Sequence, residues 1–163
     1  MTRSVHGGWK VSALAAVVLL TATACSKSST PATASYDVFA QQFRYHGMPT
    51  SIPSGNFQVN FSNKESFPIT HEMILAALPS GDSAQTVIDS AKVKGCTGGG
   101  PCESQYLHFG EVDDVSTGAT ISEVFNLPAG TYFFACWQQG TPEGGDNGPP
   151  HASIGMVQPF TVT

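Results

Sequence analysis

Alternation of apolar and polar residues dominates the chain after residue 36. In NFQVNFS, Phe57, Val59 and Phe61 fall on one face and polar residues on the other, which is the period of a half-buried β-strand. Similar patterns predict further strands at YDVFAQQFRY (36–45), THEMILAAL (70–78), YLHFGEV (106–112), ATISEVFNL (119–127), GTYFFACW (130–137) and GMVQPFTVT (155–163). Turn sequences such as SIPSG and NLPAG separate them. A total of about seven or eight strands is typical of an all-β sandwich.

One segment breaks this pattern and predicts a single short helix over residues 82–94. Asp82 can cap its first turn, and Gln85 stands three residues later, as in a capping box. Val87, Ile88 and Ala91 make an apolar face at helical spacing.

Composition agrees with short strands and many turns. The chain has 163 residues, of which 12% are charged, with 17 glycines and 11 prolines. This length suits one domain with a real core, and this balance does not suit a helical bundle.

The first 24 residues have the features of a bacterial export signal. Arg3 and Lys10 precede the apolar run VSALAAVVLL, and small residues then lead to Cys25. The run is short and alanine-rich for a membrane span. The pattern resembles a lipobox, in which Cys25 becomes the first mature residue and carries a lipid. Ordinary cleavage near Ala24 is the alternative, and a spanning helix is a weaker one.

Residues 25–35 form a Ser/Thr/Pro/Ala tether without core-forming residues, and the folded domain is predicted over 36–163. We expect an exported domain anchored at the outer face of the bacterial cell membrane. Loss of Arg3 and Lys10 leaves 5 basic against 12 acidic residues, so the mature charge is 5 − 12 = −7. The chain has no basic patch to neutralise phosphates, and nucleic acid is not an expected partner.

Three cysteines remain for an oxidising compartment if Cys25 is lipidated. Cys96 and Cys102 flank a glycine-rich loop that can bring them together, so they are the predicted disulfide. Their spacing is longer than that of a redox-active Cys-X-X-Cys pair. Cys136 is left over, as a metal ligand, a reactive nucleophile or a buried inert thiol.

The region around Cys136 resembles the C-terminal half of cupredoxins, the plastocyanin-like blue copper proteins. LPAGTYFFACW and then HASIGM match their pattern of a Gly-Thr-Tyr strand ending on Cys, followed by His and Met. Upstream, SIPSGNFQVNFSNKESFPITHEMIL looks like their other half. The resemblance covers nearly all of 36–163 and implies a Greek-key β-sandwich. It also implies one type 1 copper bound by His71, Cys136, His151 and Met156.

The residue types supply an independent reason for copper. Two imidazoles and a thiolate suit copper in both oxidation states, with a thioether as a weak axial ligand. Calcium or magnesium would require several oxygen ligands, and structural zinc usually shows closely spaced cysteine pairs. Each residue taken alone also fits a core Met, a buried Cys or a hydrogen-bonded His. His46 and His108 do not match the motif and are expected on the surface or in strands.

The chain departs from the family in the spacing between Cys136 and His151. Fourteen residues lie between them, many of them Gly or Pro, where the family has two to several. Lengthening a flexible loop costs little, so we expect a surface excursion near the metal. Glu143 and Asp146 in this insert are expected to influence partner choice.

Three functions are compatible with this site. The preferred one is one-electron transfer with a redox partner protein, by a membrane-tethered carrier that is not an enzyme. The alternatives are copper storage, delivery or sensing, and a metal-free cupredoxin-like binding module. A multicopper enzyme is disfavoured, since such enzymes need further copper sites, commonly connected through histidines beside the cysteine, and here Ala135 and Trp137 flank it.

Overall fold

The computed structural model describes residues 34–142 and 145–163. The predicted signal, Cys25 and the predicted tether up to residue 33 lie outside the described residues. So do Glu143 and the side chain of Asp146. The last two residues of the predicted tether, Ala34 and Ser35, instead begin the first strand, where they pair with a neighbouring strand. None of the described helices is long and apolar enough to cross a membrane.

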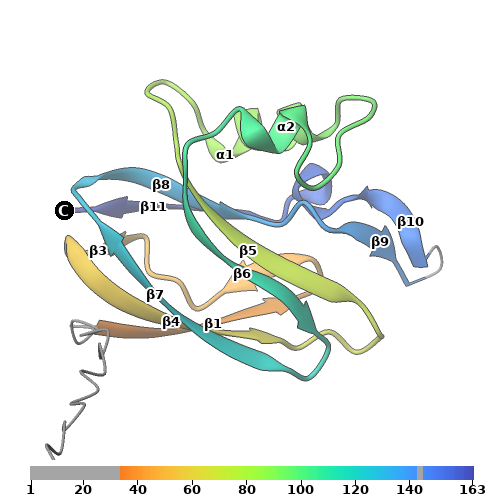
Figure 1. The fold of residues 1–163 in the computed structure, drawn as a ribbon, viewed down its shortest axis with the longest axis horizontal. Coiled ribbons are helices and arrows are strands. Elements are labelled where there is room, and N and C mark those ends of the chain that lie inside the picture. The colour runs from red at the N-terminus through yellow and green to blue at the C-terminus, as the bar shows by residue number, and fades with distance from the viewer. Residues whose placement is uncertain (1–33, 143–144) are drawn as a thin grey trace, which may run out of the picture.

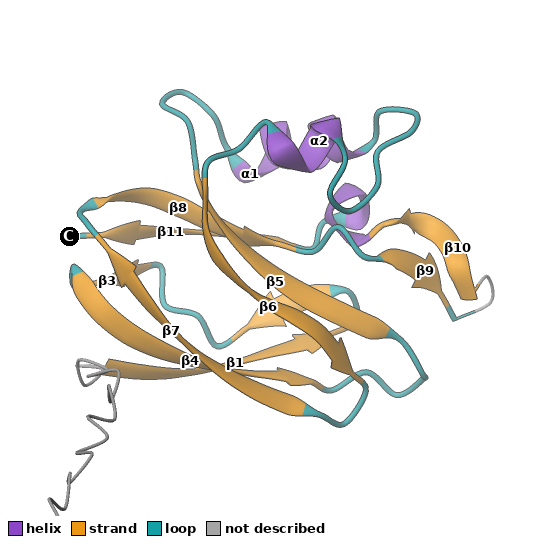
Figure 2. Cartoon of the chain, in the orientation of Figure 1, coloured by secondary structure: helices purple, strands orange, loops and turns teal. Residues whose placement is uncertain are grey.

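Within the described residues, eleven strands form two packed sheets and a separate hairpin (Figures 1 and 2). The strands are β1 (Ala34–Gln41), β2 (Arg44–His46), β3 (Ser51–Ile52), β4 (Gly55–Asn63), β5 (Thr70–Ala77), β6 (His108–Ser116), β7 (Thr120–Leu127), β8 (Gly130–Ala135), β9 (Gln139–Thr141), β10 (Gly145–Pro150) and β11 (Val157–Val162). The predicted long strands are β1, β4 to β8 and β11. The structure adds the shorter pairings of β2 and β3 and the β9–β10 hairpin.

The two sheets have the strand orders β2-β1-β4-β7 and β3-β11-β8-β5-β6. The chain crosses between them after β2, β3, β4, β6 and β7, so neighbours in a sheet are often distant in sequence. Strands β1 and β4 run parallel, as do β3 and β11, whereas the remaining pairs are antiparallel. The all-β sandwich predicted from the alternation is confirmed.

The main core lies between the sheets. Phe57, Val59 and Phe61 of β4 point into it with 0–1% exposure, as their alternation predicted. Strands β5 and β8 are buried on both faces, because a second apolar cluster covers their outer side. Their nearly continuous apolar sequences follow from this double burial.

Helices α1 (Ala84–Ala91) and α2 (Pro101–Ser104) provide this second layer (Figure 1). The predicted helix is present, but its cap differs from the prediction. Ser83 is the N-cap, and Thr86, not Gln85, completes the capping box. The helix begins later than expected because the Ser83 hydroxyl accepts the Thr86 N–H.

Helix α2 was not predicted, since it occupies the segment expected to be only a disulfide loop. Cys96 and Cys102 form the predicted disulfide, with Cα atoms 5.6 Å apart. The linked loop packs near Trp137, with the Trp137 carbonyl oxygen 3.7 Å from a Cβ placed on Gly98. The disulfide therefore fixes the helical layer behind the segment that follows β8.

The predicted strand 36–45 is in fact two strands joined by a tight turn. Gln42 and Phe43 both have positive φ, at 53° and 55°, between β1 and β2. Such a turn usually contains Asn or Gly, and a bulky residue in this conformation is strained. The sequence therefore lacks the ordinary signal of this hairpin.

Candidate metal centre

Three of the predicted ligands converge at one end of the sandwich. His71 is the second residue of β5, Cys136 directly follows β8, and His151 begins the short 3-10 helix η1 (His151–Ile154). Their ligand atoms all lie within 4.8 Å of one another, and each side chain is 0% exposed. Adjacent strands β5 and β8 carry two of them, and the loop before β11 carries the third.

The two imidazoles and the thiol face one another through particular atoms. His71 Nδ1 lies 3.0 Å from His151 Nδ1, and Cys136 Sγ lies 3.8 and 3.3 Å from these two nitrogens. Three donors at about 2.0–2.3 Å from one first-row metal ion would be separated by distances of this order. The spacing therefore fits donors that share an ion.

The far nitrogen of each imidazole has an oxygen partner. His71 Nε2 lies 3.3 Å from Glu65 Oε1, and His151 Nε2 lies 3.2 Å from the carbonyl oxygen of Gly140. A carboxylate or carbonyl oxygen only accepts, so each Nε2 carries the proton and each Nδ1 presents a lone pair. Two such lone pairs 3.0 Å apart repel unless a cation lies between them.

Burial keeps both imidazoles neutral, as ligation requires. Burial lowers the pKa of His71, against the opposing effect of its bond to Glu65. For His151, burial first and the neighbouring His71 second lower the pKa to about 4. Burial likewise raises the pKa of the Cys136 thiol, so a bound cation would have to stabilise the thiolate.

Met156, the fourth predicted ligand, is 0% exposed in the same buried cluster as Cys136. Its backbone connects the other two loop residues: the Cys136 N–H donates to the Met156 carbonyl at 3.3 Å, and the Met156 N–H donates to the His151 carbonyl at 3.0 Å. Gly155, with φ of 102°, makes the turn between them. The loop thus places Met156 beside Cys136.

The insert between Cys136 and His151 leaves and returns as a hairpin. The His151 N–H donates to the Gln138 carbonyl at 2.9 Å, so the two ends of the excursion meet. Strands β9 and β10 pair between them, and Gly140 contacts the His151 ring. The resemblance to blue copper proteins predicts an exposed edge on the His151 imidazole. This prediction is wrong, because the insert hairpin and Phe43 cover the ring and leave it 0% exposed.

Three residues that the sequence did not single out surround the ligands. The Phe43 ring packs edge-on against His71 and His151, at 5.6 and 4.9 Å between centroids. Glu65 reaches His71, and the Glu72 N–H points at Cys136 Sγ from 3.5 Å. No local pattern could have revealed Phe43 or Glu65, because their partners are far away in sequence or across a turn.

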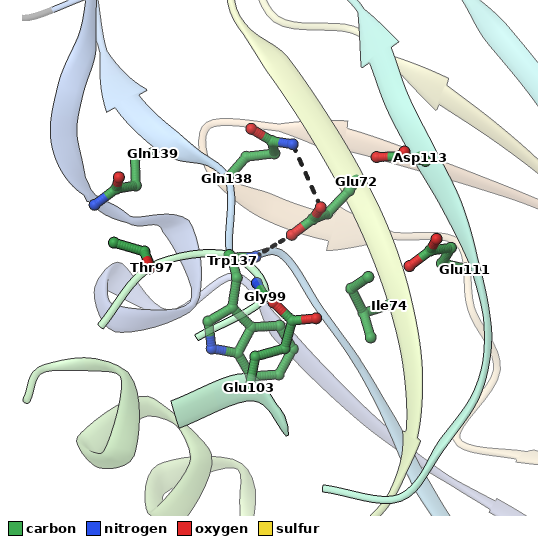
Figure 3. Close-up of a pocket in the computed structure, with 11 residues that line it drawn as sticks. Glu72, Ile74, Thr97, Gly99, Glu103, Glu111, Asp113, Trp137, Gln138 and Gln139 are labelled. Carbon is green, nitrogen blue, oxygen red and sulfur yellow. Dashed lines mark hydrogen bonds between the residues drawn. The ribbon is translucent and has the colours of Figure 1, made fainter. Parts of the chain in front are cut away.

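Glu72 also joins β5 to the residues after Cys136 through its side chain (Figure 3). Its carboxylate accepts the Trp137 N–H at 2.6 Å and approaches Gln138 Nε2 at 3.4 Å. Burial raises its pKa to about 7, partly offset by the Trp137 bond. Glu72 borders an open cleft of about 490 Å³ that also receives Glu103, Glu111 and Asp113 (Figure 3).

The two other described histidines lie away from this centre, as predicted. His46 is exposed on β2 and stacks on Phe39 at 5.0 Å. His108 is exposed on β6, with Nε2 3.3 Å from the Glu103 carbonyl.

Comparison with solved structures identifies the fold. The chain is similar to auracyanin B (TM-score 0.56, 20% identity, covering 83% of this chain and 92% of that one). It is also similar to dithionite-reduced auracyanin from the photosynthetic bacterium Roseiflexus castenholzii (TM-score 0.55, 20% identity, 82% and 99% covered). A third is the azurin Az-iso2 from the methylotroph Methylomonas sp. strain J (TM-score 0.52, 20% identity, 81% and 99% covered). These are cupredoxins, and the predicted cupredoxin-like fold is confirmed.

The likeness is confined to structure. A scan against protein-family models finds no match, and a search of the curated proteins finds none either.

Proposed function

We propose that this protein is a one-electron carrier with one type 1 copper ion bound by His71, Cys136, His151 and Met156. One observation carries the proposal: two imidazole Nδ1 atoms and the Cys136 sulfur converge in a buried space, while each Nε2 is held by an oxygen. This arrangement presents three donors to a cation. The three donor atoms lie against one another, and the sulfur also accepts the Glu72 N–H at 3.5 Å.

The donor set fits copper better than other common metals. Two imidazoles, one thiolate and a nearby thioether form the trigonal set with a weak axial ligand that is typical of electron-transfer copper sites. When bound, copper supplies a one-electron Cu(II)/Cu(I) couple. With all four positions provided by the protein, no position is left open for a substrate, and we propose no enzymatic reaction.

The residues of the chain would keep this centre rigid and dry. All four proposed ligands are 0% exposed, so water is excluded from them. The Glu72 N–H bond to sulfur and the adjacent strands β5 and β8 fix the thiolate. A deeply enclosed site retains its ion, which favours an electron carrier over a protein that delivers copper.

An electron has to cross a short layer of protein between the imidazoles and the surface. Phe43 is half-buried and contacts both rings. Beside it, exposed Arg44 donates to the carbonyls of Phe43 and Ile154, and Ile154 is 38% exposed. We propose that a redox partner protein approaches this end of the sandwich.

We further propose that the domain is exported and held at the outer face of the cell membrane by a lipid on Cys25, through the tether that precedes β1. The sequence of the export signal supports this proposal. The test is fractionation of cells that make the wild type or Cys25→Ala. The variant should leave the membrane fraction, and its continued presence there would contradict lipid anchoring.

An absorption spectrum tests the copper proposal. The purified Cu(II)-loaded protein should show an intense visible thiolate-to-copper band, which Cys136→Ser should abolish while circular dichroism stays that of a β-sandwich. His46→Ala is the matched control, because His46 is exposed and outside the centre. A wild type without the band, or a Cys136→Ser variant that keeps it, would overturn the proposal.

A further inference from the structure

Glu65 is a buried carboxylate beside a proposed ligand, and the sequence pattern gave no hint of it. It lies in the connection between β4 and β5, and its side chain is 2% exposed. Its Oε1 atom approaches His71 Nε2 at 3.3 Å and accepts the Phe43 N–H at 2.8 Å. In the described part of the chain, no Lys or Arg forms an ion pair with it.

A buried network positions this carboxylate. The Glu65 N–H donates to Asn63 Oδ1 at 3.1 Å, and Asn63 itself is 1% exposed. The Asn63 amide then donates to the carbonyls of Ile69 and Val115, at 2.8 and 2.9 Å. The connection is thereby pinned to the segment before β5 and to β6.

A carboxylate without a cationic partner is costly to bury unless a nearby positive charge compensates it. Two N–H donors, from His71 and Phe43, offset only part of that cost. A cation held by His71 Nδ1 would lie on the other side of the same ring. The geometry therefore suggests a carboxylate that acts through His71 on the metal.

We propose that Glu65 is a positioning residue that fixes the Nε2-protonated form of His71 and stabilises the oxidised state of the centre. This inference rests on the proposed copper function. Partners of the second imidazole nitrogen orient a ligating histidine and raise its basicity. The negative charge of Glu65 favours Cu(II) over Cu(I), because the ion with the larger charge interacts more strongly with it.

Glu65→Gln separates charge from orientation. The glutamine amide oxygen can still accept from His71 and Phe43, but the negative charge is lost. We expect Cu(II) affinity to fall about tenfold. Unchanged Cu(I) affinity would then correspond to a rise of about 59 mV in reduction potential.

Glu103→Gln is the matched control for Glu65→Gln. Glu103 is also buried, at 7% exposure, but its printed partner is the Gly99 N–H and not a ligand imidazole. The measurement is redox titration of both variants and the wild type, followed by absorption. A Glu65→Gln potential that matches the wild type, or that shifts no more than that of Glu103→Gln, would overturn the role of Glu65.

A second measurement needs no copper, and its main readout needs no variant. Nitrogen-15 NMR of the metal-free wild type should show His71 protonated at Nε2, and Glu65→Ala should weaken that preference. A wild-type His71 protonated at Nδ1 would contradict the inference even if no variant folds.

If the wild type binds copper with its visible band, a failed potential shift removes only the role of Glu65. Absence of the band removes both proposals.

Discussion

The two histidines of the centre are held in different ways. His71 belongs to a strand that is buried on both faces, and its outer nitrogen meets the side chain of Glu65. His151 belongs to a loop, and its outer nitrogen meets a backbone carbonyl of the insert hairpin at Gly140. One ligand is thus supported by the sandwich itself, and the other by an excursion of fourteen residues.

Because of this difference, the two imidazoles should be sensitive to different kinds of substitution. On the His71 side, one carboxylate and one amide side chain carry the support, so single polar substitutions should break it. On the His151 side, backbone geometry carries the support, so steric changes in the hairpin should break it. Four substitutions test this division, from the largest expected effect to the smallest.

Asn63→Ala should have the largest effect, through the His71 side. It leaves the Val115 carbonyl without its buried Asn63 donor and frees the Glu65 backbone N–H. The half-buried Ile69 carbonyl also loses Asn63 but keeps the Thr117 hydroxyl at 3.1 Å. We expect the free energy of unfolding to fall by about 3 kcal/mol, measured by chemical denaturation. Asn126→Ala, which removes an exposed amide contact, should change it by less than about 1 kcal/mol. If Asn63→Ala lowered the free energy of unfolding no more than Asn126→Ala does, the buried network would add no stability.

Gly148→Ala should act on the His151 side alone. A Cβ at this position would lie 2.5–2.9 Å from backbone atoms of Gly140, so the hairpin has to open where it touches His151. We expect a cost of about 1–2 kcal/mol and faster removal of copper by a chelator. Gly98→Ala is the control, since its nearest neighbour would be at 3.7 Å. Unchanged copper release would show that the hairpin does not protect the ring.

Phe43→Leu should weaken both sides equally. Leucine fills part of the same space but loses the edge-on ring contacts to His71 and His151, so we expect a loss of about 1 kcal/mol. Removal of copper by a chelator and unfolding should both become faster, while the visible absorption band keeps its position. A band shift would indicate that Phe43 also sets ligand geometry. Phe39→Leu is the control, because the half-buried Phe39 ring stacks on exposed His46 and not on a ligand imidazole.

Met156→Leu should disturb stability least, because the two side chains have similar volume in the buried cluster. We expect retention of copper, a stability cost smaller than that of Phe43→Leu and a higher reduction potential, since an axial thioether tunes the couple more than it holds the ion. The measurements are thermal unfolding and redox titration. An unchanged spectrum and potential would remove Met156 from the proposed ligand set.

Much of the fold was predictable because strand signals are local. Phe57, Val59 and Phe61 alternate with polar residues, and the structure buries all three. The hairpin at Gln42 and Phe43 was not predictable, because neither residue is a usual turn former and long-range packing has to hold the strained backbone. Helix α2 was missed for a similar reason: a four-residue helix closed by a disulfide has too little periodicity to recognise.

The sequence by itself determined the sandwich, the Cys96–Cys102 disulfide and the four residues proposed as ligands. The reason is that strand alternation, cysteine spacing and the order of residues in a motif can all be recognised in the sequence without knowing the fold. Only the tertiary structure decided how those ligands are enclosed. Glu65 is six residues from His71, but only the turn between β4 and β5 aims its carboxylate at the ring. Phe43 and Gly140 reach the imidazoles from separate hairpins. Such contacts depend on how strands pack and turn in space, and hydrophobic periodicity carries no information about that.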